Sequence, residues 1–596
     1  MSSPQQAEYL SQRPFRFYMK QFPRPFAIGV VMLFFTNLFD SLTPLALKYA
    51  IDAIQAKEEH PLLKAVLLYI GLNVAFVYFR YGWRIYWGKF HQSVADDLRA
   101  RIFTKLTFLG PSFYQKNPIG QLISIVSNDV NSFRMGIGPG FLILLDGIFY
   151  LCMYLPAMIW VSWDWTWKTL ILLPLIPPFM RKMEQLMHEY YRIEQDKLGD
   201  VSANAQEIVS GVRVIKAYTQ ESNQLASFDR KSKIYEETCN KVAKLDAIWQ
   251  PVMEFSVASG TVMLLWFCTE PVMRGAITLG TLFAFHEYIR RMTWPMSALG
   301  FSVSMIEQGR ASFDRIRELL EIETDIPDNG EKVVQEFEKL EVKDLSFRYT
   351  GAEHYALRDI SLTINAGETI GIVGPVGSGK TTLMNVICRL YPVEHGKVTY
   401  NDISVEDLKQ SSLRRLISYV PQDAFLFSDT VAENIALGYT TEQAAINERV
   451  KHFASVVNID SEIEALPTGY ESLLGERGVN LSGGQKQRLT IARALIRNSQ
   501  FVILDDSLSA VDGKTEKLIV EQLKGALDRR TVLIVSHRLA TLRHADRIFV
   551  LNNGTIEAVG KHDELLKTSV TYKELNTLQS ELVSRSGPPA DMGSVD

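Results

Sequence analysis

Long apolar runs fill much of the first half of the chain, whereas the second half alternates short apolar runs with polar turns. A helix needs about 20 mostly apolar residues to cross the hydrocarbon core of a bilayer. The segments that approach this length, with approximate ends, are 25–47, 62–87, 138–162, 165–182, 248–270 and 278–305. The fourth is short and broken by prolines, and the last is interrupted by His286, Glu287, Arg290 and Arg291. We therefore predict six transmembrane helices.

The connections between these helices differ in length and charge. Those after the second and fourth predicted helices are long and carry mixed-charge helical sequence, such as DDLRARIFTKLTFL and ANAQEIVSGVRVIKAYTQ. Basic residues are concentrated before the first predicted helix and after the fourth, on the same side of the membrane as the long connections. They are Arg13, Arg16, Lys20, Arg24, Arg181, Lys182, Arg213, Lys216 and Arg230. Because Lys and Arg are enriched in cytoplasmic loops, we expect the N-terminal segment 1–24 and both long connections to be cytoplasmic.

Four acidic residues lie within or beside the apolar runs: Asp40, Asp146, Glu254 and Glu287. Ionisable groups are costly inside a membrane and often line a transport pathway. The alternative is a structural contact at a helix end or between helices. Both interpretations stay open at the level of sequence.

Composition changes this picture little. The formal net charge is −4 and the hydrophobic share is 47%, so the charge balance gives no reason to expect nucleic acid as a partner. The cysteines have no metal-like spacing and are expected to be unpaired and structural. The tail 583–596 is polar and rich in Gly and Pro, which favours disorder.

The stretch ETIGIVGPVGSGKTT predicts a strand that ends at Val373, followed by a phosphate-binding loop. The loop matches G-x-x-x-x-G-K-[ST], and its residues are Gly374, Pro375, Val376, Gly377, Ser378, Gly379, Lys380, Thr381 and Thr382. Backbone N–H groups of such a loop wrap phosphates, and the helix that follows favours negative charge at its N-terminus. Lys380 is expected to reach the β- and γ-phosphates, and Thr381 to hold Mg²⁺.

Two further motifs extend this nucleotide site. In LSGGQKQR, residues Ser482, Gly483, Gly484 and Gln485 open a second helix whose N-terminus suits an anion. One nucleotide pocket does not need a second such helix, which suggests that these residues act on a nucleotide held by another subunit. In FVILDDSLSAVD, an apolar strand delivers Asp505 as a Mg²⁺ ligand, with Asp506 directly after it.

With these motifs in this order, residues 338–582 resemble the nucleotide-binding domain of ABC transporters. The resemblance implies that Tyr349 stacks on adenine, that Gln422 links Mg²⁺ to the membrane domain, and that His537 contacts the γ-phosphate. It also implies that Glu476 lies in a loop that contacts the membrane domain, and that Asp512, together with Ser509 and Ala510, lies in a loop that crosses the dimer. ATP and Mg²⁺ are the expected cofactors.

The first half resembles the exporter branch of the same family, in SFYQKNPIGQLISIVSNDV, EIVSGVRVIKAY and GAITLGTLFAF. The resemblance implies a half-size ABC exporter of the type IV fold. It is a multidomain membrane protein with a six-helix α transmembrane domain, long cytoplasmic helical extensions and an α/β P-loop ATPase domain. It is expected in the inner (plasma) membrane and to pair with a second half-transporter. The expected domains are 1–24, 25–320, 321–337 as a linker, 338–582 and 583–596.

Asp506 departs from the family pattern, in which the position after the magnesium-binding aspartate usually carries glutamate. Aspartate withdraws the water-orienting carboxylate by one carbon–carbon bond, and a misplacement of about 1 Å can cost about a hundredfold in rate. The expected catalytic residues are therefore Asp506, His537 and Gln422, in a site that binds ATP but hydrolyses it slowly. This pattern resembles the MdlA-type subunit of heterodimeric multidrug-like exporters. The alternative is a homodimer in which the backbone compensates.

The predicted function is ATP-driven export of hydrophobic or amphipathic compounds, with lipids as the surrounding medium. One alternative is a flippase for lipids or lipid-linked glycans with the same fold. The other is a regulatory subunit in which ATP only gates an assembly.

Overall fold

The computed structural model describes residues 13–170, 176–439, 443–475, 478, 480–511, 513–527 and 530–585. The chain divides into two compact units. The first unit comprises the residues up to Thr107 together with Pro118–Ile322. The second comprises Glu323 to the C-terminus together with the short segment Phe108–Asn117, which lies between two parts of the first unit in the sequence.

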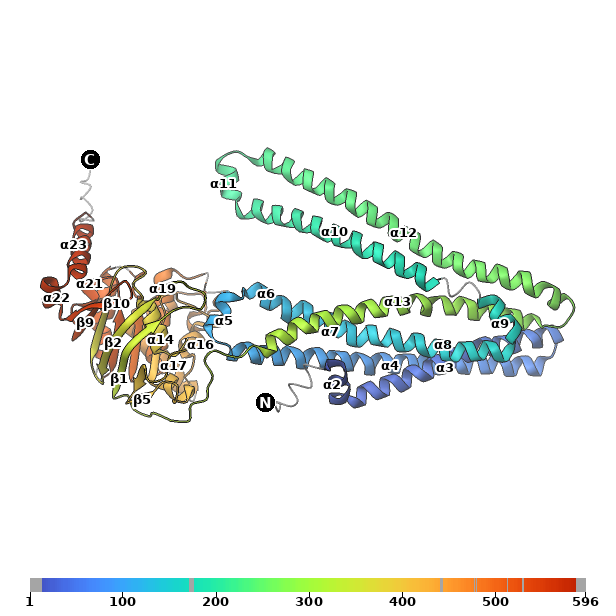
Figure 1. The fold of residues 1–596 in the computed structure, drawn as a ribbon, viewed down its shortest axis with the longest axis horizontal. Coiled ribbons are helices and arrows are strands. Elements are labelled where there is room, and N and C mark those ends of the chain that lie inside the picture. The colour runs from blue at the N-terminus through green and yellow to red at the C-terminus, as the bar shows by residue number, and fades with distance from the viewer. Residues whose placement is uncertain are drawn as a thin grey trace. The chain divides into compact units, whose positions relative to one another are not determined.

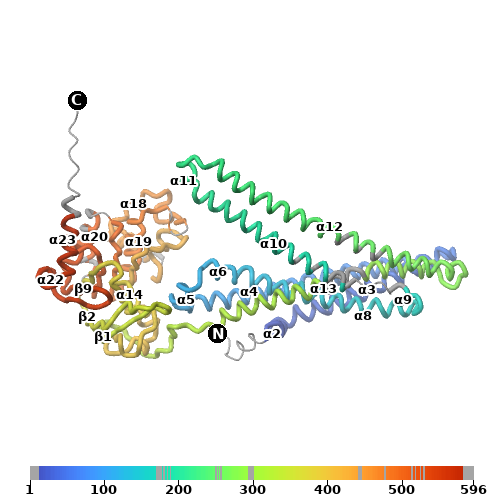
Figure 2. Tube along the Cα trace, turned by 45° about the horizontal axis from the view of Figure 1, so that its top comes forward, coloured from blue at the N-terminus to red at the C-terminus, as the bar shows by residue number. Residues whose placement is uncertain are grey.

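The first unit is helical throughout its described elements (Figure 1). They are α2 (Pro14–Gln21), α3 (Pro23–Ala56), α4 (Glu59–Phe108), α6 (Ile119–Ser124), η1 (Ile125–Asp129), α7 (Val130–Met135), η2 (Gly136–Gly140), α8 (Phe141–Val161), α9 (Trp163–Leu170), α10 (Ile176–Ser210), α11 (Val212–Ala217), α12 (Glu221–Met273) and α13 (Leu279–Glu321). Helices α3, α8 and α13 pack side by side, and α10 pairs with α12 (Figures 1 and 2).

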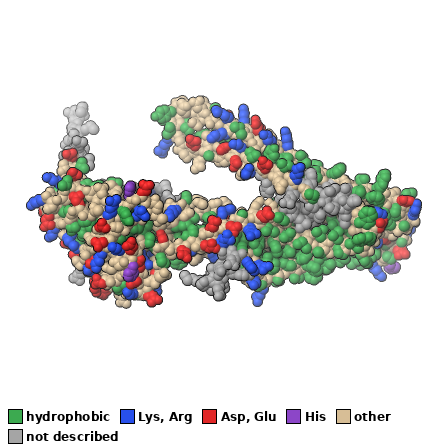
Figure 3. All heavy atoms as spheres, in the orientation of Figure 1, with side chains coloured by type: hydrophobic (Ala, Val, Ile, Leu, Met, Phe, Trp, Pro, Cys, Tyr) green, Lys and Arg blue, Asp and Glu red, His purple; other side chains and the backbone are tan. Residues whose placement is uncertain are grey.

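Three helical stretches among the described residues are long and apolar enough to cross a membrane: Pro23–Ala56, Glu59–Phe108 and Ile119–Val161. Hydrophobic side chains cover much of the visible face of α3, α4 and α8 (Figure 3), and an apolar surface of that extent suits lipid rather than water. These stretches cover the first three predicted spans, apart from residue 162 at the end of the third. The other three remain predictions, and the fourth falls partly on residues 171–175, outside the described ranges.

Buried polar contacts join α3, α8 and α13. The Asp40 carboxylate accepts hydrogen bonds from the hydroxyls of Tyr150, at 2.8 Å, and Tyr154, and it forms an ion pair with Arg291. Arg291 also pairs with Glu287 at 3.3 Å. Asp146 accepts a hydrogen bond from the Asn37 side chain at 2.8 Å, whereas Glu254 lies exposed on α12. These contacts favour the structural interpretation for Asp40 and Asp146.

The second unit contains two sheets. An antiparallel sheet has the order β2–β1–β4–β5, and a mostly parallel sheet has the order β10–β9–β3–β8–β7–β6. The strands are β1 (Lys339–Phe347), β2 (Leu357–Asn365), β3 (Thr369–Val373), β4 (Val398–Tyr400), β5 (Ile403–Ser404), β6 (Ile417–Val420), β7 (Phe501–Asp505), β8 (Thr531–Val535), β9 (Arg547–Asn552) and β10 (Thr555–Gly560). Only β10 runs antiparallel to its neighbour in the larger sheet.

Helices cover both faces of the larger sheet, as expected where the parallel strands are buried on both sides. The described helices of this unit are α5 (Pro111–Lys116), α14 (Lys380–Ile387), α15 (Gln410–Leu416), α16 (Val431–Ala436), α17 (Gln443–Val456), α18 (Asp460–Glu464), η4 (Gly469–Glu471), α19 (Gly483–Ile496), α20 (Gly513–Ala526), α21 (Leu539–Leu542), α22 (His562–Thr568) and α23 (Val570–Arg585). Successive residues of β7 enter different cores: Phe501 and Ile503 belong to one, and Val502 and Leu504 to the other.

The parallel strands β3, β6, β7 and β8 bring the predicted motifs to one edge of this sheet. Their carboxyl ends lead into the residues after Val373, Val420, Asp505 and Val535. Ligands of open α/β sheets bind outside the carboxyl ends of the strands. The topology therefore collects the glycine-rich loop, Gln422, Asp506 and His537 at the same edge.

Candidate nucleotide-binding site

The glycine-rich loop after β3 follows a path that only glycine permits at two points. A Cβ at Gly374 would lie 2.1 Å from the Leu551 carbonyl oxygen. Gly379 has φ +99°, and a Cβ there would lie 2.7 Å from the Ala356 carbonyl oxygen. Side chains are strained in that left-handed region. The tight path ends at Lys380, the first residue of α14, so the loop leads directly into a helix N-terminus.

Lys380 is folded into this loop. Its Nζ donates hydrogen bonds to the carbonyl oxygens of Gly374 and Pro375, both at 2.8 Å. Burial lowers the pKa of Lys380, while the nearby carboxylates of Asp506 and Asp505 act in the opposite direction. The ammonium group is thus held where a phosphate bound by the loop would meet it. Val376, by contrast, points outward and is 90% exposed.

Asp505 and Thr381 form an oxygen-rich pair between β7 and α14. Asp505 is 1% exposed and accepts a hydrogen bond from the Tyr419 hydroxyl at 3.2 Å. Burial raises the pKa of Asp505, and hydrogen bonds from Thr381 and Tyr419 oppose that effect. Oxygen donors of this kind fit Mg²⁺, which takes one or two protein ligands and completes its shell with water and phosphate. Gln422 lies exposed after β6.

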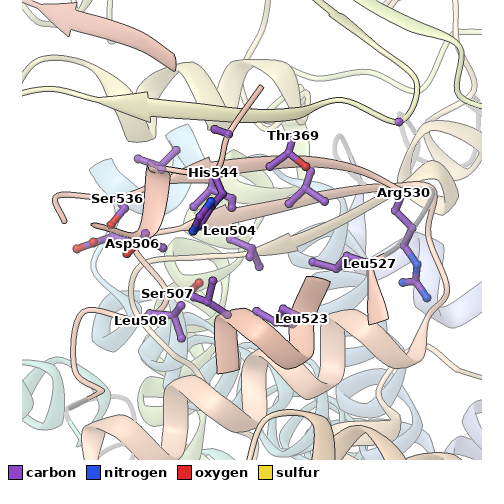
Figure 4. Close-up of a pocket in the computed structure, with 17 residues that line it drawn as sticks. Thr369, Leu504, Asp506, Ser507, Leu508, Leu523, Leu527, Arg530, Ser536 and His544 are labelled. Carbon is purple, nitrogen blue, oxygen red and sulfur yellow. The ribbon is translucent and has the colours of Figure 1, made fainter. Parts of the chain in front are cut away.

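Asp506 adopts a backbone conformation that few residues tolerate. Its φ is +45°, in the left-handed region where Asp and Asn are enriched. Its N–H donates to the Val535 carbonyl at 2.9 Å, which ties it to β8. In Figure 4, Asp506 and Ser536 lie together at one end of a cavity of ≈ 360 Å³, and Arg530 lies at the other.

His537 follows β8 and is half-buried. Burial and the charge of Lys380 lower the pKa of His537, while Asp506 and Asp505 oppose that shift. The imidazole is therefore neutral at pH 7 and able to accept or donate one hydrogen bond. These electrostatic contacts show that Lys380, Asp505, Asp506 and His537 lie close together, although they come from three different strand ends.

Tyr349 contacts the loop from the antiparallel sheet. Its hydroxyl lies 3.0 Å from the Thr382 hydroxyl, and its ring meets the Tyr391 ring edge-on with centroids 5.3 Å apart. The Tyr391 hydroxyl in turn accepts a hydrogen bond of 2.6 Å from Gln115 of α5. The segment Phe108–Asn117 thus packs directly behind the aromatic group expected to stack on adenine. Gln115 belongs to the quoted stretch SFYQKNPIGQLISIVSNDV, but nothing in the sequence pairs it with Tyr391, which is 276 residues away in the chain.

Ser482 begins α19 with a capping box. Its hydroxyl accepts the Gln485 N–H at 3.3 Å, and the Gln485 side chain accepts the Ser482 N–H at 2.8 Å. Ser482 and Gly483 are exposed. Within the described parts of the chain, no hydrogen bond joins Ser482–Gln485 to the glycine-rich loop. Two residues of the sequence analysis, Glu476 and Asp512, lie outside the described residues.

Comparison with known proteins identifies both halves of the chain. The family model for the ABC transporter transmembrane region matches residues 26–296, and the ABC transporter model matches residues 357–509. The structure of a bacterial Atm1-family ABC exporter with ATP bound has a TM-score of 0.76 at 24% identity, and the likeness covers 94% of this chain and 98% of that one. That likeness supports the fold.

Curated relatives span nearly the whole length. The chain is 34% identical to the probable multidrug resistance ABC transporter ATP-binding/permease protein YheI of Bacillus subtilis, covering 96% of this chain and 98% of the relative. It is 33% identical to the multidrug resistance-like ATP-binding protein MdlA of Escherichia coli (94% and 95%). It is 32% identical to an ATP-dependent lipid A-core flippase of Syntrophus aciditrophicus (93% and 92%). The resemblance inferred from the motifs is confirmed: this chain belongs to the ABC transporter superfamily and has the half-size exporter fold, a membrane-spanning region joined to an ABC ATPase.

Proposed function

We propose that this chain is the ATP-binding and permease subunit of an exporter for hydrophobic or amphipathic compounds. The main support is the meeting of the glycine-rich loop, Asp505 and His537 at one sheet edge, in a chain that also carries membrane-spanning helices. The multidrug names of the YheI and MdlA relatives point in the same direction. In this proposal the protein lies in the inner (plasma) membrane, and the ATPase unit and the N-terminus face the cytoplasm.

The working form is a dimer that clamps nucleotide between subunits. The glycine-rich loop of one subunit holds the phosphates, and Ser482–Gln485 of the other closes over them. The exposed Ser482 and Gly483 at the start of α19 support this arrangement, because a helix N-terminus attracts anions. We infer a second, different half-transporter as the partner, since Asp506 weakens this chain's own site while its Ser482–Gln485 surface is intact.

Each residue at the sheet edge has a separate role in ATP hydrolysis. Lys380 neutralises phosphate charge, and the neutral His537 hydrogen-bonds the γ-phosphate. Thr381, Asp505 and Gln422 would hold Mg²⁺, which screens the charge that develops on the phosphates. Asp506 would orient the attacking water, but its carboxylate is one carbon–carbon bond shorter than that of glutamate. The result is a site that retains ATP and hydrolyses it slowly.

Transport by inverted membrane vesicles tests the proposal. Vesicles that contain the chain and its copurifying partner are expected to accumulate a fluorescent amphipathic compound only when ATP and Mg²⁺ are supplied. Lys380→Ala in this chain should sharply reduce accumulation, because the ammonium group that meets the phosphates is lost. ATP hydrolysis without accumulation of any amphipath or labelled lipid would favour a regulatory subunit instead.

A flippase remains the second candidate, supported by the similarity to a lipid A-core flippase. The same vesicles distinguish the two functions when fluorescent phospholipid is placed in one leaflet. Faster ATP-dependent movement of the lipid than of soluble amphipaths, together with stimulation of the ATPase by lipid, would assign the flippase function.

The Gln115–Tyr391 contact is expected to couple ATP binding to transport. Gln115→Ala and Tyr391→Phe each remove one hydrogen bond. Such a bond contributes about 1 kcal/mol, which corresponds to a roughly fivefold change in an equilibrium constant. Each variant should move about fivefold less substrate per ATP hydrolysed, because Phe108–Asn117 no longer follows the aromatic group behind the nucleotide. The measurement is the ratio of vesicle uptake to phosphate release, with Lys116→Ala on the same helix as control. An unchanged ratio in both variants would remove this contact from the coupling route.

A further inference from the structure

The segment Ser507–Val511, here called the crossing segment, is held from two sides within the ATPase unit. On one side, Gln487 of α19 donates from Nε2 to the Ser509 hydroxyl at 3.0 Å, and its Oε1 accepts the Ala510 N–H at 2.9 Å. On the other side, Arg538 donates to the carbonyl oxygens of Ser509, at 3.2 Å, and Val511, at 3.3 Å. The crossing segment therefore has fixed neighbours on both flanks.

Gln487 connects this segment to the surface that the chain presents to a second subunit. It is 6% exposed and lies in the helix that begins with Gly483, next to the capping residue Ser482. A Cβ at Gly484 would lie 3.0 Å from the Ala510 carbonyl oxygen, so the start of α19 touches the crossing segment directly. Both ends of the Gln487 amide are bonded, which fixes the orientation of the side chain.

The same segment is tied to the chain's own ATP site. The Ser509 hydroxyl and N–H both donate to the Asp506 carbonyl oxygen, at 2.9 Å and 3.3 Å. Arg538 directly follows His537 in the sequence and is anchored by an ion pair with Glu516, which is 7% exposed. Short contacts therefore connect Asp506 and the residue after His537 to Gln487. Buried polar networks of this kind have few alternative arrangements.

We propose that Gln487 is a positioning residue that couples the two nucleotide sites of the dimer. It carries the state of this chain's own site, through Ser509 and Ala510, to the Ser482–Gln485 surface that closes over the nucleotide of the second subunit. The inference rests on the proposed function in one respect, namely that Ser482–Gln485 acts across the dimer. It holds whether the second subunit is a different chain or another copy.

The test measures ATP hydrolysis at the second subunit's loop while this chain's own site is disabled. Full-length protein is purified with its copurifying partner, or with a differently tagged second copy if the chain pairs with itself. Lys380→Ala is placed only in the tagged copy. With native Gln487, this change should lower hydrolysis at the other site by at least about fivefold, the lower end of typical coupling between two sites.

Gln487→Leu in the same copy is expected to abolish that sensitivity, so that adding Lys380→Ala then changes the rate less than twofold. Such a cycle of single and double variants isolates coupling from a general loss of activity. Ser509→Ala, which removes one of the two Gln487 contacts together with the hydroxyl bond to the Asp506 carbonyl, should weaken the sensitivity and serves if the leucine variant unfolds. Ser418→Ala is the matched control, because it removes a buried hydrogen bond to Ser499 of 2.8 Å elsewhere in the unit.

Two results would overturn the proposal. One is an equal effect of Lys380→Ala with Gln487 and with leucine at that position. The other is no effect of Lys380→Ala with native Gln487. Failure of the proposed function would look different: either the native protein would not form a dimer or hydrolyse ATP, or it would hydrolyse ATP without accumulating substrate in vesicles.

Discussion

Asp506→Glu is expected to raise ATP hydrolysis at this chain's own site by about a hundredfold, the factor associated with a misplacement of about 1 Å. The longer side chain brings its carboxylate to the distance at which it can orient water against the γ-phosphate. The measurement is phosphate release by the full-length dimer, in a background where the partner's glutamate at the equivalent position is replaced by glutamine. Without that background, the faster site of the proposed heterodimer partner would mask the gain.

The backbone conformation at Asp506 affects the stability of the glutamate variant. Its φ of +45° suits Asp and Asn but strains glutamate by about 1–2 kcal/mol, so the variant should unfold at a slightly lower temperature. Asp506→Asn is the matched control, because asparagine tolerates the same conformation but lacks the carboxylate. The Asp506→Asn variant should still bind ATP, but it should show no residual ATP hydrolysis. A glutamate variant no faster than the native chain in that background would show that reach is not limiting.

Asp40→Asn is expected to destabilise the membrane unit, by less than the roughly 3–5 kcal/mol of a fully uncompensated buried charge, because Arg291 keeps its second ion pair, with Glu287 at 3.3 Å. The pair with Arg291 is largely buried, with the two side chains 12% and 20% exposed, and it joins α3 to α13. The midpoint of thermal unfolding of the full-length protein in detergent should fall clearly. Asp40→Asn combined with Arg291→Gln should recover most of the loss, because no unpaired charge then remains.

Glu270→Gln provides the control for this prediction. Glu270 also forms an ion pair, with Arg274, but both side chains are about 70% exposed, and exposed pairs contribute at most about 1 kcal/mol. The control should leave the unfolding midpoint almost unchanged. If Asp40→Asn has an equally small effect, the pair with Arg291 does not hold the helices together, and a role for Asp40 in the transport pathway becomes the better interpretation.

Local motifs predicted the candidate nucleotide site from the sequence. Gly374 and Gly379 mark a phosphate loop because the backbone path at these two positions leaves no room for a Cβ, and Lys380 follows directly. The apolar run before Asp505 specifies a buried strand, since five consecutive buried positions suit the middle of a parallel sheet. The first three membrane helices followed from the length of their apolar runs, whereas charged residues and residues 171–175 leave the last three spans as predictions.

The contacts between distant segments were not predictable in this way. No spacing in the sequence pairs Gln487 and Arg538 with Ser509, or Gln115 with Tyr391, and only packing brings these residues together. The same holds for Asp40, whose sequence environment allowed both a pathway role and a structural one. Its partners come from two other helices, far apart in the chain.

By itself, the sequence determined the class of chemistry, the order of the two units and the unusual carboxylate at position 506, because these depend on residue type and short spacing. Only the tertiary structure decided which polar groups meet. These are the Asp40–Arg291 ion pair, the Gln115–Tyr391 hydrogen bond, and the hydrogen bonds from Gln487 and Arg538 to Ser507–Val511. The physical reason is that a hydrogen bond or ion pair requires atoms to approach within a few ångströms, and for residues distant in sequence only the packed fold sets that distance.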